Sequence, residues 1–431
     1  MNIVLLSGGS GKRLWPLSND VQSKQFLKLL KNNRGEYESM VQRVVRQLTS
    51  CHENATIFVS CNHSQSEIIQ RQLGSVETIL EPSRRDTFPA IALAAAHLKH
   101  KKHMDNDDVF VVCPIDVFAD NTYFELLSDV VALATTGKQV IGLLGAIPSY
   151  PSEKYGYIEH NGGKVTGFKE KPNVVVAEKL IEKGALWNCG VFAVKIGYVL
   201  NCASKYVAFD SYEELYAQYS KLPQISFDYE IVENEPAIGV IIYEGTWKDL
   251  GTWNTLTEEI SGNSLGKYVL LSENSANTHV LNMLDIPIIV QDVEDTVVIA
   301  SYDGILVSSK QGSSFLKPLA EQIEIQPMYE QRSWGDYRIL EYNQKGDNLT
   351  IVKRVRIEPG QAVTSECTDE MRKVIIVLGG KAILTNKGQD SIVSTGSLID
   401  IRSDFSLLAA TEVQLIEITC YTEGMLEVNR S

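Results

Sequence analysis

Short apolar runs alternate with segments of helical periodicity over the first 262 residues of the chain. The runs that predict strands are Ile3 to Leu6, Thr56 to Ser60, Thr78 to Leu80, Val109 to Val112 and Val140 to Leu144. The segments that predict helices are Ser39 to Leu48, Ser64 to Leu73, Pro89 to His100 and Tyr123 to Ala134. This alternation predicts an α/β fold with a mostly parallel sheet, helices on both faces, and ligands at the carboxyl ends of the strands.

The pattern changes twice beyond this block. Residues 263–326 contain short β runs with turns and no helix of convincing length, which predicts a small β-rich module; its runs are Val269 to Leu271, Ile288 to Val290, Thr296 to Ala300 and Ile305 to Val307. Residues 327–431 contain many short strands with glycines between them, a pattern typical of an antiparallel barrel or jelly roll. We therefore expect domains at 1–262, 263–326 and 327–431.

Composition and charge narrow the classes of function. The 431 residues are 44% apolar and carry a net charge of −14, so binding to nucleic acid or to an anionic membrane is not expected. The seven cysteines are odd in number, scattered and without a Cys-x-x-Cys pair, which indicates a reducing compartment rather than disulfides or a structural zinc site. No apolar run approaches the length of a membrane span. We expect a soluble, cytoplasmic protein.

The first predicted strand runs into a glycine-rich turn with two cations, Ser7-Gly8-Gly9-Ser10-Gly11-Lys12-Arg13, and Lys24 follows. Glycines let backbone N–H groups approach anionic oxygens, and the cations add charge, so the segment predicts a triphosphate site. The turn is not a Walker loop, because no Gly-Lys-Ser/Thr follows. It is not a dinucleotide fingerprint either, because the third glycine is missing.

The continuation Arg13-Leu14-Trp15-Pro16-Leu17-Ser18, followed by Ser23-Lys24-Gln25-Phe26-Leu27, resembles the sugar-phosphate nucleotidyltransferases, most closely the mannose-1-phosphate guanylyltransferases. The resemblance implies a Rossmann-like nucleotidyltransferase domain. It also implies that Arg13 and the glycine loop bind the triphosphate and that Lys24 stabilises charge at the α-phosphate. The expected nucleotide-binding residues at this loop are Leu6, Ser7, Gly8, Gly9, Gly11, Lys12 and Arg13.

Two aspartates are candidate ligands for a divalent metal. Asp116 follows the predicted strand Val109 to Val112, and Asp249 lies in Trp247-Lys248-Asp249-Leu250-Gly251-Thr252-Trp253. Carboxylate oxygens suit Mg²⁺ held between a protein and substrate phosphates. Taken alone, either aspartate is more often a helix cap or a loop residue. In the family, the corresponding aspartates hold the metal.

Recognition of a sugar phosphate is expected from further segments of the first block. Phe168-Lys169-Glu170-Lys171-Pro172 resembles a family signature in which the lysine binds the sugar's phosphate and the glutamate binds a sugar hydroxyl. Gly156 and Asn188 lie in segments that match those contacting the sugar, and Asp228 matches a secondary position near the sugar pocket. By itself, a Lys-Pro dipeptide is normally a solvated turn.

Selection of the nucleobase is expected from the segment Glu81 to Ala92, through Arg85, Asp86 and Thr87. Asp86 stands where the family usually has asparagine, and Phe88 stands where it usually has alanine. The first change replaces amide donors with an acceptor and the second adds a large ring, so both are candidate determinants of base choice. The alternative interpretation is that Asp86 or Thr87 serves only as a helix N-cap.

The last block resembles the cupin domain attached to bifunctional phosphomannose isomerase/guanylyltransferase proteins, through Arg332 to Tyr337, Val352 to Val355 and Glu358-Pro359-Gly360. In those proteins the next strand carries metal-binding histidines. Here all seven histidines lie at or before His279, so we expect no isomerase activity. Glu366, Asp369 and Glu370 are interpreted as a solvated turn rather than a remodelled metal site. We assign the barrel a structural or oligomerising role.

These observations predict a Mg²⁺-dependent nucleotidyltransferase that converts GTP and mannose 1-phosphate to GDP-mannose and pyrophosphate, a product that can feed polysaccharide biosynthesis. One alternative is the same chemistry with another pair, such as CTP or UTP with another sugar phosphate. An alternative from another class is a non-catalytic nucleotide-sugar sensor. The chain has all five residues of the proposed machinery, which are Arg13, Lys24, Asp116, Lys171 and Asp249. A protein that only binds nucleotide-sugar would not need the whole set, so their presence argues against the sensor.

Overall fold

The computed structural model describes residues 1–8, 11–19, 22–346, 348–368 and 371–421. The chain divides into two compact units. The first comprises Met1–Leu14, Ser23–Gly262 and Lys310–Leu316, and the second comprises Trp15–Gln22, Asn263–Ser309 and Lys317–Ser431. No helix in the described part of the chain is long and apolar enough to cross a membrane.

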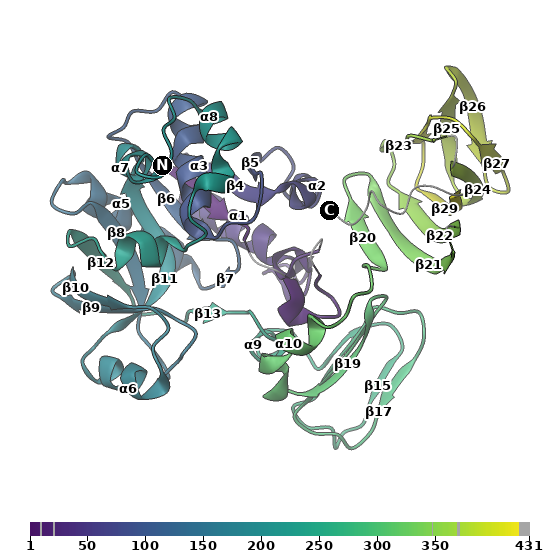
Figure 1. Cartoon of the computed structure of the whole chain (residues 1–431). Helices are drawn as coiled ribbons and strands as arrows, with labels where there is room; N and C mark the ends of the chain where they lie inside the picture. The colour runs from purple at the N-terminus through teal and green to yellow at the C-terminus, as the bar shows by residue number, and fades with distance from the viewer. Residues whose placement is uncertain (9–10, 20–21, 347, 369–370, 422–431) are drawn as a thin grey trace. The chain divides into compact units, whose positions relative to one another are not determined.

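The first unit is built on a nine-stranded mixed sheet (Figure 1), with the order β5-β4-β1-β6-β11-β8-β12-β10-β9. Its strands are β1 (Asn2–Leu6), β4 (Thr56–Asn62), β5 (Glu77–Glu81), β6 (Val109–Pro114), β8 (Ile141–Ala146), β9 (Tyr157–Asn161), β10 (Lys164–Lys169), β11 (Leu186–Lys195) and β12 (Ile238–Tyr243). Strands β5, β4, β1 and β6 run parallel, as do β8 and β12, whereas β11 is antiparallel to both β6 and β8. The predicted α/β class is confirmed.

Helices cover both faces of this sheet. The helices of this unit are α1 (Met40–Cys51), α2 (His63–Leu73), α3 (Thr87–His100), α4 (Asn121–Glu125), α5 (Leu127–Thr135), α6 (Val174–Glu182), α7 (Ile196–Ala203), α8 (Tyr212–Ala217) and α9 (Trp253–Thr257). Successive residues of a strand point to opposite faces. Val4 of β1 accordingly packs in the core cluster that includes α3 and α7, whereas Ile3 and Leu5 pack with α1, α2 and α5.

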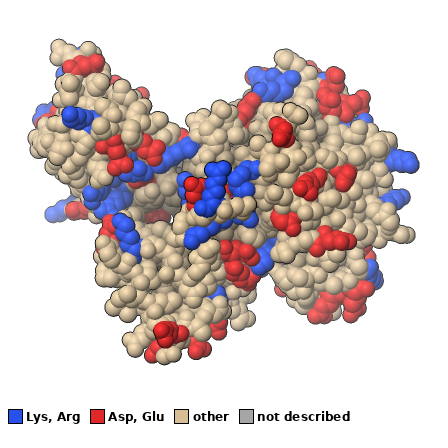
Figure 2. Space-filling view, turned by 180° about the vertical axis from the view of Figure 1, so that it is seen from behind, with Lys and Arg blue, Asp and Glu red and all other residues tan. Residues whose placement is uncertain are grey.

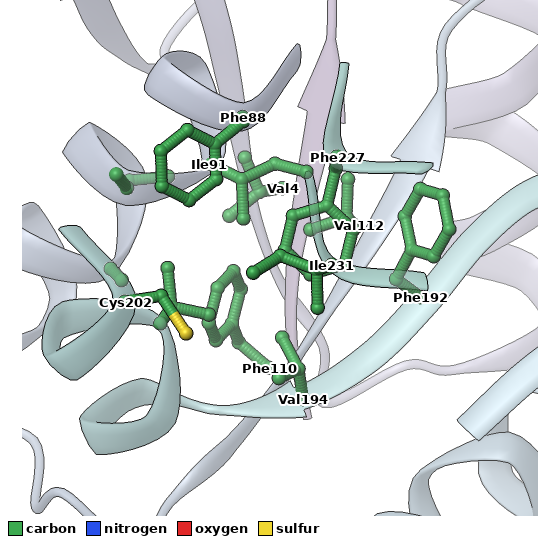
Figure 3. Packing of buried hydrophobic residues seen from close by; sticks show 14 of the residues in the cluster. Val4, Phe88, Ile91, Phe110, Val112, Phe192, Val194, Cys202, Phe227 and Ile231 are labelled. Carbon is green, nitrogen blue, oxygen red and sulfur yellow. The ribbon is translucent and has the colours of Figure 1, made fainter. Parts of the chain in front are cut away.

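Two features of the helices differ from the sequence pattern. The helix expected from Tyr123 to Ala134 is split at Leu126, whose N–H donates to carbonyls of the preceding turn. Helix α3 is buried along most of its length and therefore lacks a polar face. Figure 3 shows its residues Phe88 and Ile91 packed near Val4 of the sheet.

The second unit contains two kinds of β-structure. In the first, β14 (Ser264–Gly266), β16 (His279–Asn282) and β18 (Thr296–Ser301) pair in parallel, β15 (Val269–Leu271) pairs in parallel with β17 (Ile288–Val290), and only β19 (Gly304–Ser309) is antiparallel. The chain therefore coils through parallel rungs around a small core of Val280, Val290 and Val298.

The second kind consists of two antiparallel sheets that enclose an apolar core (Figure 1), as expected for the last block. One sheet contains β20 (Tyr329–Arg332), β21 (Gly335–Lys345), β22 (Asn348–Ile357), β24 (Met371–Gly379), β27 (Leu398–Ile401) and β29 (Val413–Tyr421). The other contains β23 (Ala362–Ser365), β25 (Lys381–Asn386), β26 (Gln389–Ser394) and β28 (Phe405–Ala409). Asp369 and Glu370 lie outside the described residues.

Basic and acidic side chains are interspersed on the face of the molecule shown in Figure 2. The net charge of −14 is therefore not accompanied there by an extended surface of one sign. All seven cysteines are free thiols.

Candidate functional site

The centre of the site is a lysine held between two aspartates. Lys24 lies in the short 3-10 helix η2 (Lys24–Phe26), and its Nζ is 2.8 Å from Asp116 Oδ2 and 3.0 Å from Asp249 Oδ1. Asp116 follows the carboxyl end of β6, and Asp249 belongs to β13 (Lys248–Asp249). Strand β13 pairs with β7 (Val117–Phe118), so that Asp249 lies opposite Val117. This pairing explains how residues 133 positions apart in sequence reach one cation.

At this centre, the neighbouring charges favour the charged forms of Lys24 and Asp249. Burial lowers the pKa of the Lys24 ammonium, but the charges of Asp116 and Asp249 outweigh burial and raise it well above its ordinary value. Burial raises the pKa of Asp249, but Lys24, Arg13 and Lys154 outweigh it and hold this pKa below its usual range. Lys24 is therefore held in its charged form between the two aspartates, and the ionised form of Asp249 is favoured by the cations around it.

A cavity of about 200 Å³ opens beside this centre. Its walls are Pro114, Asp116, Val117, Lys154, Tyr155, Gly156, Glu170, Asn188, Cys189, Gly190, Trp247 and Asp249. A Cβ on Gly156 would stand 2.4 Å from Glu170 Oε2 and 2.7 Å from Phe168 Cζ. Only glycine therefore fits at position 156 while Glu170 keeps its place. The expected sugar residues Gly156, Glu170 and Asn188 thus line the same cavity as the two aspartates.

Polar side chains extend the site beyond the cavity wall. Asn188 Nδ2 donates to Asp228 Oδ1 at 2.6 Å, and Lys171 Nζ donates to Glu170 Oε1 at 2.6 Å. Burial, and then the charge of Glu170, raise the pKa of Asp228 to about 7. Lys171 has a φ of 44°, an uncommon conformation for a residue with a side chain. Its side chain remains 55% exposed while its ammonium pairs with Glu170.

The glycine loop lies at the end of β1, beside the same sheet edge. Gly8 is exposed, and a Cβ built on it would meet no atom within 4 Å, so the space that a ligand would approach is open. Gly9 lies outside the described residues. Gly11, Lys12 and Arg13 begin the 3-10 helix η1 (Gly11–Leu14), with Arg13 exposed.

The two loop residues that precede Gly8 lie deeper. Leu6 is half-buried at the end of β1, and Ser7 is 2% exposed. The hydroxyl of Ser7 is engaged by buried glutamines, which are described below. These two residues therefore shape the base of the loop rather than its open side.

The residues expected at the nucleobase hold the start of α3. Arg85 Nε donates to the carbonyl of Leu222 at 3.0 Å, and Thr87 Oγ1 accepts from Phe227 N–H at 2.8 Å. Asp86 is the N-cap residue of α3 and accepts from Thr87 N–H at 2.8 Å. None of the three is among the residues that line the described cavity. Asp86 therefore caps helix α3, as the alternative interpretation expected.

The expectation that Phe88 influences base choice is contradicted. Its ring is completely buried in the core of the first unit, so it cannot contact a nucleotide there. Figure 3 shows the ring beside Ile91. The physical reason is that α3 is apolar on nearly every side, so the position after Thr87 faces the core rather than the sheet edge.

Sequence reasoning missed two groups of residues near the centre. Lys154 lines the cavity and contributes to the lowered pKa of Asp249; its position two residues before Gly156 was the available signal. Gln25 and Gln65 form a buried hydrogen-bond network behind Lys24. A glutamine in an amphipathic helix is usually solvated, so the sequence held no signal for Gln65.

Comparison with known proteins identifies the fold and the relatives. A mannose-1-phosphate guanylyltransferase of Escherichia coli (strain K12) is 28% identical over 443 residues, spanning 92% of this chain and 90% of the relative. The alginate biosynthesis protein AlgA of Pseudomonas aeruginosa is 27% identical over 428 residues, spanning 89% of this chain and 85% of the relative.

Solved structures and family models agree with these relatives. The crystal structure of mannose-1-phosphate geranyltransferase from Thermus thermophilus superposes with a TM-score of 0.62 at 26% identity, covering 75% of this chain and 99% of that one. The model of the family described as nucleotidyl transferase matches residues 2–263, more than half of the chain. The resemblance drawn from the motifs is confirmed, and the chain belongs to the nucleotidyl transferase family.

Proposed function

We propose that this chain transfers the guanylyl group of GTP to mannose 1-phosphate, giving GDP-mannose and pyrophosphate. The observation that carries the proposal is the Lys24 centre: one lysine and two carboxylates converge beside a cavity lined by Gly156 and Glu170. The choice of GTP and mannose 1-phosphate is supported by relatives that span about nine-tenths of the chain and bear the name mannose-1-phosphate guanylyltransferase.

The reaction brings two anions together. An oxygen of the sugar 1-phosphate attacks the α-phosphorus of the triphosphate, the bond to the β-phosphate breaks, and pyrophosphate carries away the bonding electron pair. In this assignment Arg13 and the glycine loop bind the triphosphate, Lys24 neutralises charge at the α-phosphate, and Lys171 orients the attacking phosphate. Glu170, Asn188 and Asp228 bind sugar hydroxyls.

The residues present fit Mg²⁺. Asp116 and Asp249 already converge on one cation, the ammonium of Lys24, and their side chains are 29% and 32% exposed. No group of three or more His, Cys, Asp or Glu side chains in the described residues is arranged to hold a metal. Two carboxylates, with water and substrate phosphates as further ligands, are a common environment for Mg²⁺. When bound, Mg²⁺ would supply positive charge that neutralises the phosphates.

The nucleobase and the cellular setting belong to the proposal as well. The start of α3, with Arg85, Asp86 and Thr87, remains our proposed contact for the base, although these side chains also hold the helix start.

The free cysteines are compatible with a reducing compartment, and we place the reaction in the cytoplasm. We further propose that no nucleic acid or membrane takes part and that the barrel has a structural or oligomerising role.

Pyrophosphate release tests this function. The purified chain with Mg²⁺ is supplied with GTP, CTP, UTP, ATP or dTTP, each paired with mannose 1-phosphate or glucose 1-phosphate. The proposal expects release with GTP and mannose 1-phosphate at a rate at least about tenfold above every other pair, a difference in barrier of about 1.4 kcal/mol. Faster release with another pair would contradict the assigned substrates. Binding of GDP-mannose without release from any pair would favour the sensor.

A further inference from the structure

Two side chains of helix α2 hydrogen-bond to residues that precede and follow Lys24 in the sequence. Gln65 Nε2 donates to Ser23 Oγ at 3.0 Å, directly before Lys24. Gln72 Nε2 donates to the carbonyl of Phe26 at 2.8 Å, two residues after Lys24. Residues seven apart lie on the same side of an α-helix, two turns from each other. The two amides therefore grip the short helix η2 at both ends.

Gln65 also connects this helix to the glycine loop. Ser7 Oγ donates to Gln65 Oε1 at 3.3 Å, and Gln25 Nε2 donates to Ser7 Oγ at 3.0 Å. One carboxamide therefore joins the residue before the glycines to the residue before Lys24. Ser7, Ser23, Gln25 and Gln65 are each at most 2% exposed. In such a network, a lost partner leaves a buried polar group unsatisfied, so its geometry is strongly constrained.

Helix α2 is attached to the protein by contacts other than those to the Lys24 segment. The helix packs into the core through Ile68 and Ile69, which are 3% and 0% exposed. Its first turn is capped by Asn62, whose side chain accepts from Gln65 N–H at 3.1 Å. The Nε2 groups of Gln65 and Gln72 donate to the segment that carries Lys24, while Gln72 Oε1 accepts from Ser39 Oγ, the N-cap residue of α1, at 2.6 Å.

Lys24 requires such support because its ammonium sits on a flexible four-carbon stem. The two aspartates hold the ammonium in the structure. In the proposed reaction it turns to the α-phosphate, and its backbone must then be positioned from behind. Displacement by about 1 Å of a group that acts on the reacting atoms can lower a rate about a hundredfold.

We propose that Gln65 and Gln72 make α2 a clamp that positions Lys24 for catalysis, acting through Ser23 and the Phe26 carbonyl. They are positioning residues and touch no substrate. The clamp rests on the proposed function, because it assigns Lys24 its place at the α-phosphate.

The test replaces Gln65 with methionine and measures kcat and both KM values. Methionine keeps the length and the helix propensity but has no amide. The clamp expects Gln65→Met to lower kcat by about ten- to a hundredfold, with less than threefold change in the KM for mannose 1-phosphate. Gln70→Met is the matched control, because Gln70 is exposed on the same helix; its kinetics are expected to be unchanged. Rates are normalised to folded enzyme, since a purely structural role would lower only that amount.

A double-mutant cycle separates positioning of Lys24 from a general effect. If Gln65 acts through Lys24, then Gln65→Met lowers the residual turnover of Lys24→Met by less than twofold. An equal loss in both backgrounds would overturn the clamp. Should Gln65→Met fail to fold, Gln72→Met serves instead: it removes the donor to the Phe26 carbonyl and leaves the buried hydrogen bonds of Gln65 in place, with Ser39→Ala as the control for the lost Ser39 bond. If Lys24→Met retains full turnover, the role of Lys24 in the proposed function fails, which is a separate outcome.

Discussion

The substitution Gly156→Ala tests how closely the site fits its sugar phosphate. The added Cβ would stand 2.4 Å from Glu170 Oε2, 2.7 Å from Phe168 Cζ and 3.4 Å from Asn188 Cβ. The side chain of Glu170 is only 7% exposed and is held by Lys171, so it has little space to move. Overpacking of this kind typically costs about 1–3 kcal/mol.

The added methyl group would displace Glu170. In the proposed function, Glu170 binds a sugar hydroxyl equally in the ground state and in the transition state. Loss of binding that is equal in both states raises KM and leaves kcat nearly unchanged. A cost of about 1–3 kcal/mol corresponds to a rise in the KM for mannose 1-phosphate of about five- to 150-fold, and the KM for GTP should change less than about threefold.

Initial rates of pyrophosphate release, with each substrate varied in turn, measure these constants. Gly379→Ala is the control, because a Cβ there meets no atom within 4 Å and its backbone conformation is not one that favours glycine. An unchanged KM for mannose 1-phosphate in a folded Gly156→Ala variant would refute the argument that Glu170 binds the sugar across Gly156.

Three further predictions concern pH, the core and the metal. Because the pKa of Asp228 is about 7 in the folded protein and about 4 when unfolded, its carboxyl costs stability as pH rises from 4 to 8. Asp228→Asn should therefore gain stability over the parent in that window, by on the order of 4 kcal/mol at pH 8; an equal difference at pH 4 and pH 8 argues against a raised pKa. Phe88→Ala should destabilise the protein by about 3–5 kcal/mol in thermal or chemical unfolding, without changing the preference among nucleotides; an altered preference would place Phe88 at the base after all. Removal of divalent cations by chelation should abolish turnover and leave the melting temperature unchanged, because Lys24 already bridges the two aspartates; turnover that survives chelation would contradict the Mg²⁺ assignment.

The centre of the site was predictable because its parts follow buried strands. Asp116 comes after the apolar run that forms β6, and Lys24 comes after the strand and glycine loop at β1. The carboxyl ends of adjacent parallel strands meet at one edge of a sheet, and β1 pairs with β6 in parallel. The strand pattern placed Asp116 at this edge, whereas Lys24 and Asp249 were assigned to the site by the motifs that carry them.

Other features depend on contacts that have no local signature. The burial of Phe88 depends on packing across α3, and the role of Gln65 depends on Ser23, which is 42 positions away in sequence. The short β runs of residues 263–309 do not show whether neighbours pair in parallel or antiparallel, because the alternation of side chains is the same in both. The coil of parallel rungs is fixed by stacking around Val280, Val290 and Val298.

The most direct test of the account compares Lys24→Met with Lys28→Met. The two variants remove one ammonium each, four positions apart, and Lys28 is exposed whereas Lys24 bridges Asp116 and Asp249. In a single-turnover measurement of pyrophosphate release with saturating GTP and mannose 1-phosphate, Lys24→Met should be slower by about a thousandfold, or about 4 kcal/mol in the barrier. Lys28→Met should match the parent. Equal rates for the parent and a folded Lys24→Met variant would contradict the assignment of Lys24 as the centre of catalysis.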